Sequence, residues 1–156
     1  MVTTVYLIRH GETEGAEAKR YKGSIDVPLS KNGIRQIEKI TGHIAQTNYS
    51  NGLNSLNAVY CSPLSRALKS AEIIAEPHGL IPVQIKDLLE RSFGIWEGMS
   101  YTEIEEKYPE EFRAWAGNPL KYSPVGGEST LEVKNRVIPA INMLLSNHPP
   151  TNPSPS

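Results

Sequence analysis

The sequence predicts an α/β domain with a mainly parallel sheet flanked by helices. Short runs rich in Val, Ile, Thr and Tyr, which favour strands, occur at residues 2–8, 58–61 and 82–86. Segments with helical spacing of apolar residues come between and after these runs. Strands that alternate with helices in this way are typical of a parallel sheet. The 156 residues are enough for one such domain with a real core.

The first helix is expected to begin at Ser30, after the first strand at residues 2–8. The hydroxyl of Ser30 can accept a hydrogen bond from a backbone amide of the first helical turn, as an N-cap does. An apolar stripe at helical spacing follows, made of Ile34, Ile37, Ile40 and Ile44. The polar stretch 48–57 is expected to be a loop.

The second strand, 58–61, leads directly into the second helix. Ser62 and Pro63 predict the helix start, because a capping hydroxyl precedes a proline where no amide donor is needed. Apolar residues between 64 and 75 supply the buried face of this helix, and Pro77 ends it.

The third strand, 82–86, precedes two further helical segments. One is expected at 101–115 and the other at 130–145, with an irregular stretch at 119–127 between them. Glu128 is a candidate cap of the last helix. Pro139 lies inside that helix, so a kink or a break is expected there.

Composition excludes several classes of protein. The net charge of −1 gives no broad basic field for nucleic acid or acidic membranes, and no apolar run is long enough to span a bilayer. The N-terminus lacks the basic-then-apolar pattern of a secretory signal. Cys61 has no second cysteine to pair with, so we expect a reduced, cytoplasmic location.

Four chemistry-bearing residues follow the predicted strands. Arg9 and His10 end the first strand, Arg66 lies one turn after the second, and Glu90 follows the third. Ligands of parallel sheets bind beyond the carboxyl ends of the strands. The four side chains are therefore expected at one edge of the sheet.

Arg66 points to a phosphate ligand. It lies near the start of its helix, where the helix dipole disfavours a cation and favours an anion. A guanidinium and a helix amino end aimed at the same spot suit phosphate oxygens. By itself Arg66 is better explained as an ordinary surface arginine on an amphipathic helix. Together with Arg9 and His10 it favours a phosphate site.

These residues predict a phosphoryl transfer without a metal or cofactor. His10 would attack phosphorus while Arg9 and Arg66 neutralise the phosphate charge. Glu90 is the expected donor of a proton to the leaving oxygen. Cys61 offers a rival nucleophile, but only four residues separate it from Arg66, one too few for the C-x5-R loop of cysteine phosphatases. Cys61 is therefore expected to be buried packing.

Five motifs resemble the histidine phosphatase superfamily, the phosphoglycerate mutase-like fold. They are LIRHGET, RYKGSIDVPLSKNG, CSPLSRALKSAE, LLERSFGIWEG and PVGGES, in the family's order over nearly the whole chain. The resemblance implies His10 as phosphorylated nucleophile, Glu90 as proton donor, and Arg9 and Arg66 as phosphate ligands. It adds Lys22 and Gly23 as substrate contacts.

Within the family, the chain is most similar to alpha-ribazole phosphatases of cobalamin synthesis. Small broad-specificity phosphatases are similar too. Phosphoglycerate mutases carry a longer segment between the WEG and GES regions, which makes a mutase the weaker alternative. The expected partner is a small phosphorylated substrate.

The sequence departs from the family in two places. Ala16 stands where the family often has an asparagine that helps to hold phosphate. The second catalytic histidine of the family, in an H-G motif after a further strand, has no counterpart after Leu145. His148 is expected to lie at a helix end rather than to replace it. We therefore expect a C-terminally incomplete domain at 1–147, with a disordered tail at 148–156.

Two consequences are expected from this departure. Turnover would be weak or absent, which leaves a phosphate-binding form with little turnover as an alternative to a working phosphomonoesterase. The first strand, 2–8, would have an unpaired edge, and this edge would favour a homodimer.

Overall fold

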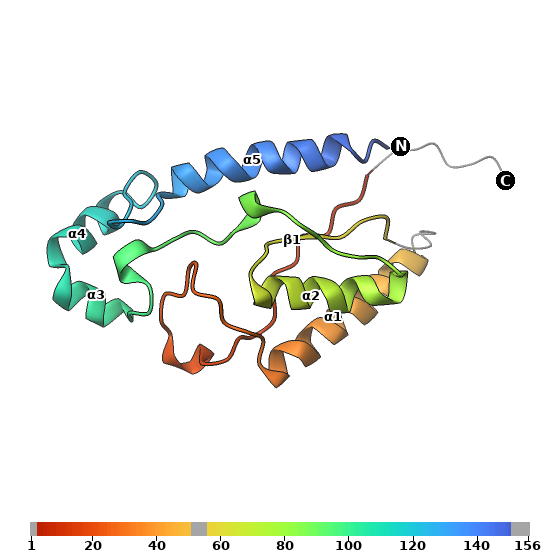
Figure 1. Cartoon of the computed structure of the whole chain (residues 1–156), viewed down its shortest axis with the longest axis horizontal. Helices are drawn as coiled ribbons and strands as arrows, with labels where there is room; N and C mark the ends of the chain where they lie inside the picture. The colour runs from red at the N-terminus through yellow and green to blue at the C-terminus, as the bar shows by residue number, and fades with distance from the viewer. Residues whose placement is uncertain (1–2, 51–55, 151–156) are drawn as a thin grey trace.

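The computed structural model describes residues 3–50 and 56–150. Within them, two short strands and five α-helices form an α/β fold, joined by single turns of 3-10 helix (Figure 1). The expected fold class is confirmed. The strands are β1 (Tyr60–Cys61) and β2 (Val83–Gln84), and the helices are α1 (Lys31–Ser50), α2 (Ser65–Ala75), α3 (Tyr101–Lys107), α4 (Pro109–Gly117) and α5 (Thr130–Ser146).

The two strands pair in parallel. Tyr60 lies opposite Val83 and Cys61 lies opposite Gln84. The amides of Val83 and Ile85 donate to backbone carbonyls of the first strand segment at 2.9 and 2.8 Å. The strands predicted at 58–61 and 82–86 are therefore confirmed, in shorter form, and a crossover through α2 joins them as parallel pairing requires.

The strand predicted at 2–8 is wrong for the described residues. Residues 3–10 form no strand, and no backbone–backbone hydrogen bond joins 4–10 to the rest of the described chain. Strand propensity alone does not make a strand, because the extended backbone needs a ladder partner. The segment is held instead by side chains such as Tyr6, whose hydroxyl donates to Asn48 Oδ1 at 2.8 Å.

Helix α1 packs against α2 around one hydrophobic cluster, on the same side of the molecule (Figure 1). The buried members are Leu29, Ile37, Ile44 and Ile74, so the predicted isoleucine stripe is the buried face of α1. Ser30 is confirmed as the N-cap, since its hydroxyl oxygen accepts from the Gly33 amide at 3.0 Å. The helix runs on to residue 50, beyond the loop start predicted at 48, and 51–55 lie outside the described residues.

Helix α2 begins two residues later than predicted. Ser62 is not its N-cap, because the first helical residue is Ser65. Asp26 takes the capping role from a distant loop: its Oδ1 accepts from the amide and the hydroxyl of Ser65, at 2.8 and 2.7 Å. A carboxylate is a favourable group at a helix amino end, and no local pattern in the sequence reveals that it comes from another loop.

The helix predicted at 101–115 is two helices. Pro109 has no amide to donate and begins α4, so α3 ends at Lys107. Their buried residues, Ile104 of α3 and Phe112 of α4, form a second hydrophobic cluster with Trp96. This cluster lies at the opposite end of the molecule from α1 and α2 (Figure 1).

The last helix, α5, is longer and more regular than predicted. It continues through Pro139 without a break. Glu128 is not its cap. Ser129 is the N-cap, and it forms a reciprocal capping box with Glu132.

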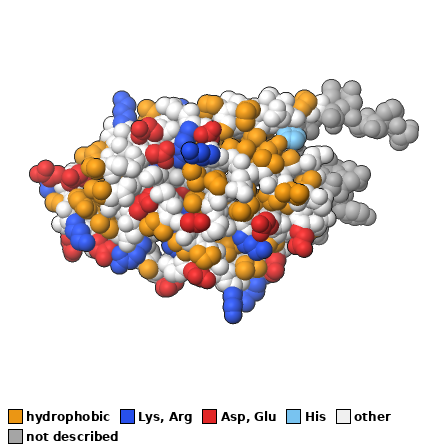
Figure 2. Space-filling view, in the orientation of Figure 1, with side chains coloured by type: hydrophobic (Ala, Val, Ile, Leu, Met, Phe, Trp, Pro, Cys, Tyr) orange, Lys and Arg blue, Asp and Glu red, His pale blue; other side chains and the backbone are white. Residues whose placement is uncertain are grey.

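Large hydrophobic side chains lie exposed on the face between α5 and α2 (Figure 2). Leu7 is 87% exposed and Ile81 is 88% exposed, and Val5, Val83, Met143 and Leu145 are exposed too. No helix in the described part is both long and apolar enough to cross a bilayer. The homodimer expected through residues 2–8 stays a prediction, although the described part of this segment, 3–8, forms no strand edge.

We predict that Leu7→Lys weakens self-association of the chain. Leu7 exposes almost its whole side chain, and a lysine on an unpaired extended segment opposes pairing with another chain. Sedimentation velocity over a concentration series measures the effect. Leu120→Lys is the control, because Leu120 is 50% exposed in the segment between α4 and α5. Equal sedimentation of wild type and Leu7→Lys would contradict the prediction.

Candidate active site

His10 lies where the N-terminal segment meets the start of α1. The next residue, Gly11, is buried against Gly33 of that helix. A side chain at either glycine would overlap backbone: the Gly33 carbonyl in one case and the Glu12 carbonyl in the other. Two glycines therefore allow the close backbone contact that places His10.

The imidazole of His10 has one nitrogen engaged and one free. Its Nδ1 lies 2.7 Å from the carbonyl oxygen of Gly11. A carbonyl only accepts, so Nδ1 carries the proton and donates. The lone pair of a neutral ring is then on Nε2, which is the atom that can attack phosphorus.

Arg9 presents an unpaired cation beside His10. It is exposed, and its guanidinium makes no hydrogen bond or ion pair with the described residues. Five N–H donors are thus open to a ligand. An arginine left free next to a potential nucleophile suits a dianionic phosphate.

Arg66 is the second cation, and it is buried, at 3% exposure. Its Nη1 donates to the Ile25 carbonyl at 2.9 Å, and its Nη2 donates to the Gly23 carbonyl at 2.8 Å. No carboxylate of the described chain pairs with it. A buried charge is costly without a counter-ion, and three of its five donors stay available for one.

One amide of the helix amino end expected beside Arg66 is already engaged. Ser65 N–H donates to Asp26 Oδ1 there, which leaves fewer amides of α2 for a phosphate than expected. Arg66 instead organises the loop that also contains Asp26. The unpaired charge of Arg66 therefore carries more of the phosphate argument than the helix dipole does.

Lys22 and Gly23 begin this loop. The ammonium of Lys22 donates to Thr13 Oγ1 at 2.6 Å and to the Glu14 carbonyl at 2.7 Å, so it connects the loop to the segment after His10. Gly23 has a φ of 50°, in the left-handed region. A Cβ there would lie 2.5 Å from Glu97 Oε1, which makes glycine necessary.

Glu90 is exposed and lines a cavity of about 270 Å³. Its Oε1 accepts from the amide of Arg91 at 3.0 Å, and it makes no other side-chain bond within the described chain. Ser24, Ser92 and Lys86 also line this cavity, which places Glu90 beside the loop that Arg66 holds. Within the described chain no hydrogen bond or ion pair joins Glu90 to Arg9, His10 or Arg66, so the expected gathering of the four side chains stays a prediction.

Glu97 is a second carboxyl beside this loop, and it has a structural position. It accepts from Ser24 N and Phe93 N, at 2.9 and 3.0 Å, and from the hydroxyls of Ser24 and Ser92. Burial raises the pKa of Glu97, but these hydrogen bonds outweigh burial and hold the pKa below its usual value. A carboxyl that stays ionised is a poor general acid.

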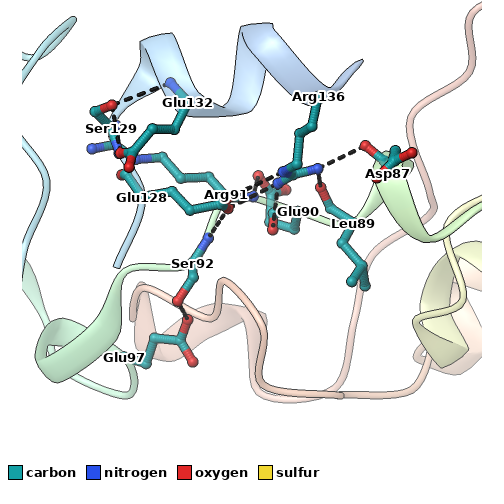
Figure 3. A network of polar contacts seen from close by, with 10 residues as sticks. All are labelled: Asp87, Leu89, Glu90, Arg91, Ser92, Glu97, Glu128, Ser129, Glu132 and Arg136. Atoms are coloured by element: carbon teal, nitrogen blue, oxygen red, sulfur yellow. Dashed lines mark hydrogen bonds and ion pairs between the residues drawn. The ribbon is translucent and has the colours of Figure 1, made fainter. Parts of the chain in front are cut away.

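Glu128 joins the cavity wall to α5 (Figure 3). Its carboxylate accepts from Arg136 Nε and Nη2, at 2.7 and 2.9 Å, and from the Ser92 amide at 3.0 Å. The Arg136 hydrogen bond lowers the pKa of Glu128, and the carboxylate raises the pKa of Arg136 in return. Sequence reasoning missed Arg136, because nothing in its helical spacing distinguishes it from a surface residue.

None of the other three histidines contacts His10. His148 lies just after α5, where its Nε2 is 2.7 Å from the Tyr60 hydroxyl, as a structural contact between α5 and β1. His43 is exposed on α1, and His78 lies in a turn. The tail expected at 148–156 is outside the described residues from 151 onwards.

Cys61 is buried, as predicted. Burial raises the pKa of its thiol, which opposes the thiolate that a cysteine phosphatase needs. Within 3–50 and 56–150 no cluster of three or more His, Cys, Asp or Glu residues could hold a metal ion.

Comparison with known proteins identifies the family. The model of the histidine phosphatase superfamily (branch 1) matches residues 5–152. Phosphoserine phosphatase 1 of Hydrogenobacter thermophilus is 37% identical over 131 residues, which are 84% of this chain and 59% of that protein.

Two solved structures share the fold. The alpha-ribazole phosphatase of Shigella flexneri has a TM-score of 0.79 and 28% identity, over 90% of this chain and 66% of that one. Mycobacterial glucosyl-3-phosphoglycerate phosphatase, in complex with VO3, has a TM-score of 0.77 and 26% identity, over 90% and 63%. The chain thus spans about three fifths of the length of these relatives.

We predict opposite effects of alanine at two glycines of α1. Gly33→Ala should destabilise the chain by about 1–3 kcal/mol, because the new Cβ meets the backbone of Glu12. Gly42→Ala should stabilise it by about 0.5–1 kcal/mol, since nothing lies within 4 Å and alanine favours helix. Urea denaturation measures both. Stabilisation by Gly33→Ala would refute the close contact that places His10.

Proposed function

The chain belongs to the histidine phosphatase superfamily, and on this premise we propose that it is a phosphomonoester hydrolase that acts through a phosphohistidine at His10. The carrying observation is the orientation of His10: Nδ1–H is bound by the Gly11 carbonyl, which leaves Nε2 without a partner among the described residues. Arg9, next to it in the sequence, is exposed and unpaired within the described chain. This arrangement supports an in-line attack by a neutral imidazole on a phosphate whose charge is compensated.

The proposed reaction has two steps. His10 Nε2 attacks phosphorus, the phosphorus–ester oxygen bond breaks, and Glu90 gives its proton to the departing alkoxide. A water molecule then attacks the phosphohistidine, Glu90 takes the proton of that water, and inorganic phosphate leaves with His10 restored. Arg9 and the three unengaged donors of Arg66 support charge compensation, because both steps carry negative charge on the phosphoryl oxygens.

A small phosphorylated metabolite is the proposed substrate class. Structural likeness supports alpha-ribazole 5'-phosphate, and hence a role in cobalamin synthesis, whereas sequence likeness supports phosphoserine. Turnover of these two esters and of 3-phosphoglycerate, measured side by side at equal concentrations, separates the candidates. The same panel tests the weaker mutase alternative, because a mutase would transfer phosphate within the glycerate without releasing it. A cytoplasmic location stays a prediction.

The second candidate function is phosphate binding with little turnover. No other histidine touches His10, so the described chain offers no second imidazole to the phosphoryl group. Loss of one such donor costs on the order of 100- to 1,000-fold in rate. A stoichiometric burst of alcohol without further release would favour this form over a working enzyme.

We predict that His10→Ala abolishes phosphoenzyme formation. His10 has its Nε2 free, whereas His148 Nε2 lies against Tyr60. The chain is mixed with labelled phosphate ester, denatured rapidly in base, and the label is located by mass spectrometry. His43→Ala is the matched control, because His43 is exposed on α1 and should keep full labelling. Label that persists at another residue after His10→Ala would sink the assignment.

We predict that Glu90→Gln slows esters with poor leaving groups far more than activated aryl esters. A general acid contributes roughly 100- to 10,000-fold where the leaving oxygen needs a proton. Glu97→Gln is the comparison: it should destabilise the chain, because the carboxylate holds Ser24 and Phe93, while the ratio of the two rates stays unchanged. Equal losses on both esters after Glu90→Gln would make Glu90 structural.

A further inference from the structure

Every donor of the Arg136 guanidinium is engaged by one of four residues: Glu128, Asp87, Leu89 or Glu90 (Figure 3). Nε and Nη2 bind the two carboxylate oxygens of Glu128, at 2.7 and 2.9 Å. The remaining N–H groups donate to three backbone carbonyls of the segment 87–90. Nη1 donates to the carbonyls of Asp87 and Leu89, at 2.7 and 2.8 Å, and Nη2 donates to the carbonyl of Glu90 at 3.3 Å. An arginine has five N–H groups, so none is left for a ligand.

Glu128 fixes the backbone that follows Glu90 in the chain. Its Oε2 also accepts from the Ser92 amide at 3.0 Å. The backbone on both sides of Glu90 is therefore fixed to one ion pair at the start of α5. Side-chain exposures of 21% for Arg136 and 28% for Glu128 show that the pair is largely shielded from water, where charge-assisted bonds are stronger.

The side chain of Glu90, unlike its backbone, is not held by Arg136 or Glu128. Its carboxylate accepts only from the adjacent Arg91 amide and faces the cavity. A proton donor needs its backbone fixed and its carboxyl able to move, because the carboxyl must reach the leaving oxygen and later a water molecule. Glu90 combines these two properties. Arg136 also lines the cavity, but Glu128 and the carbonyls of 87–90 engage all of its donors. We therefore expect it to act on the chemistry through Glu90 and not by binding a ligand.

We propose that Arg136, locked in place by Glu128, is the positioning residue that sets Glu90 for protonation of the leaving group. This role rests on the proposed phosphomonoesterase function. A displacement of about 1 Å at a reacting group can cost on the order of 100-fold in rate. Arg136→Gln should therefore slow alcohol release from an alkyl phosphate by about 10- to 100-fold, and leave release from 4-nitrophenyl phosphate nearly unchanged.

The experiment measures single-turnover alcohol release from both esters for wild type and variants. Arg136→Lys keeps the charge but loses the planar fork, so it should behave like Arg136→Gln. Lys134→Gln, an exposed neighbour on the same helix, is the control and should match wild type on both esters. In a Glu90→Gln background, Arg136→Gln should cause no further change in the ratio of the two rates, because both changes act on one group.

Amide hydrogen exchange gives a readout that needs no catalysis. Arg136→Gln should speed exchange at 89–92 while Lys134→Gln does not. Glu128→Gln, which keeps the side-chain volume, provides a second variant should Arg136→Gln fail to fold, and it should speed exchange at the same residues. Unchanged exchange in both would overturn the inference.

The outcomes separate the two hypotheses. Equal slowing of both esters by Arg136→Gln would overturn the positioning role and leave the proposed function intact. No alcohol release from wild type, with either ester, would overturn the proposed function and this role together. A lower ratio of alkyl to aryl rates, absent in the Glu90→Gln background, would establish the role.

Discussion

The buried charge of Arg66 is the constraint on which the rest of the site depends. Arg66 is 3% exposed, and its guanidinium has no carboxylate partner in the described chain and donates to two carbonyls of the loop 22–26. Those two bonds fix a loop that reaches in three directions: Lys22 extends to Thr13, Ser24 extends to Glu97, and Asp26 caps α2. Removing the cation would leave these contacts without their common support.

Arg66 and Arg136 are both shielded from water, but only the charge of Arg136 is balanced by a carboxylate of the described chain. Arg136 has all five donors satisfied and carries a full ion pair with Glu128, so its charge is balanced inside the protein. Arg66 has three donors to spare and no counter-ion. An incoming phosphate would therefore gain more from Arg66 than from Arg136, because only the former charge is uncompensated before the ligand arrives.

Local patterns predicted those parts of the fold that depend on nearby residues. Ser30 was identifiable as a cap, and the isoleucine stripe as the buried face of α1, because both depend on spacing within one helix. The split at Pro109 was also readable from the chemistry of proline, but was not predicted. Asp26 as the cap of α2, and Arg136 as the holder of Glu90, depend on contacts between distant segments. Spacing within one segment carries no signal for such contacts. The prediction of a strand at 2–8 was wrong for a related reason: the strand propensity of these residues does not show whether another strand pairs with them.

The same failure bears on how His10 is held. In a parallel sheet the residue after a strand inherits its position from the ladder, but residues 4–10 have no backbone–backbone hydrogen bond to the described chain. His10 is positioned instead by the contact between Gly11 and Gly33 and, further back, by Tyr6 against Asn48. Such contacts fix the backbone at two points and leave the stretch between them less constrained than a ladder would. Rigidity at Glu90 and looser support at His10 are therefore built into one site. His10, more than Glu90, is the group whose position depends on what packs against residues 3–10.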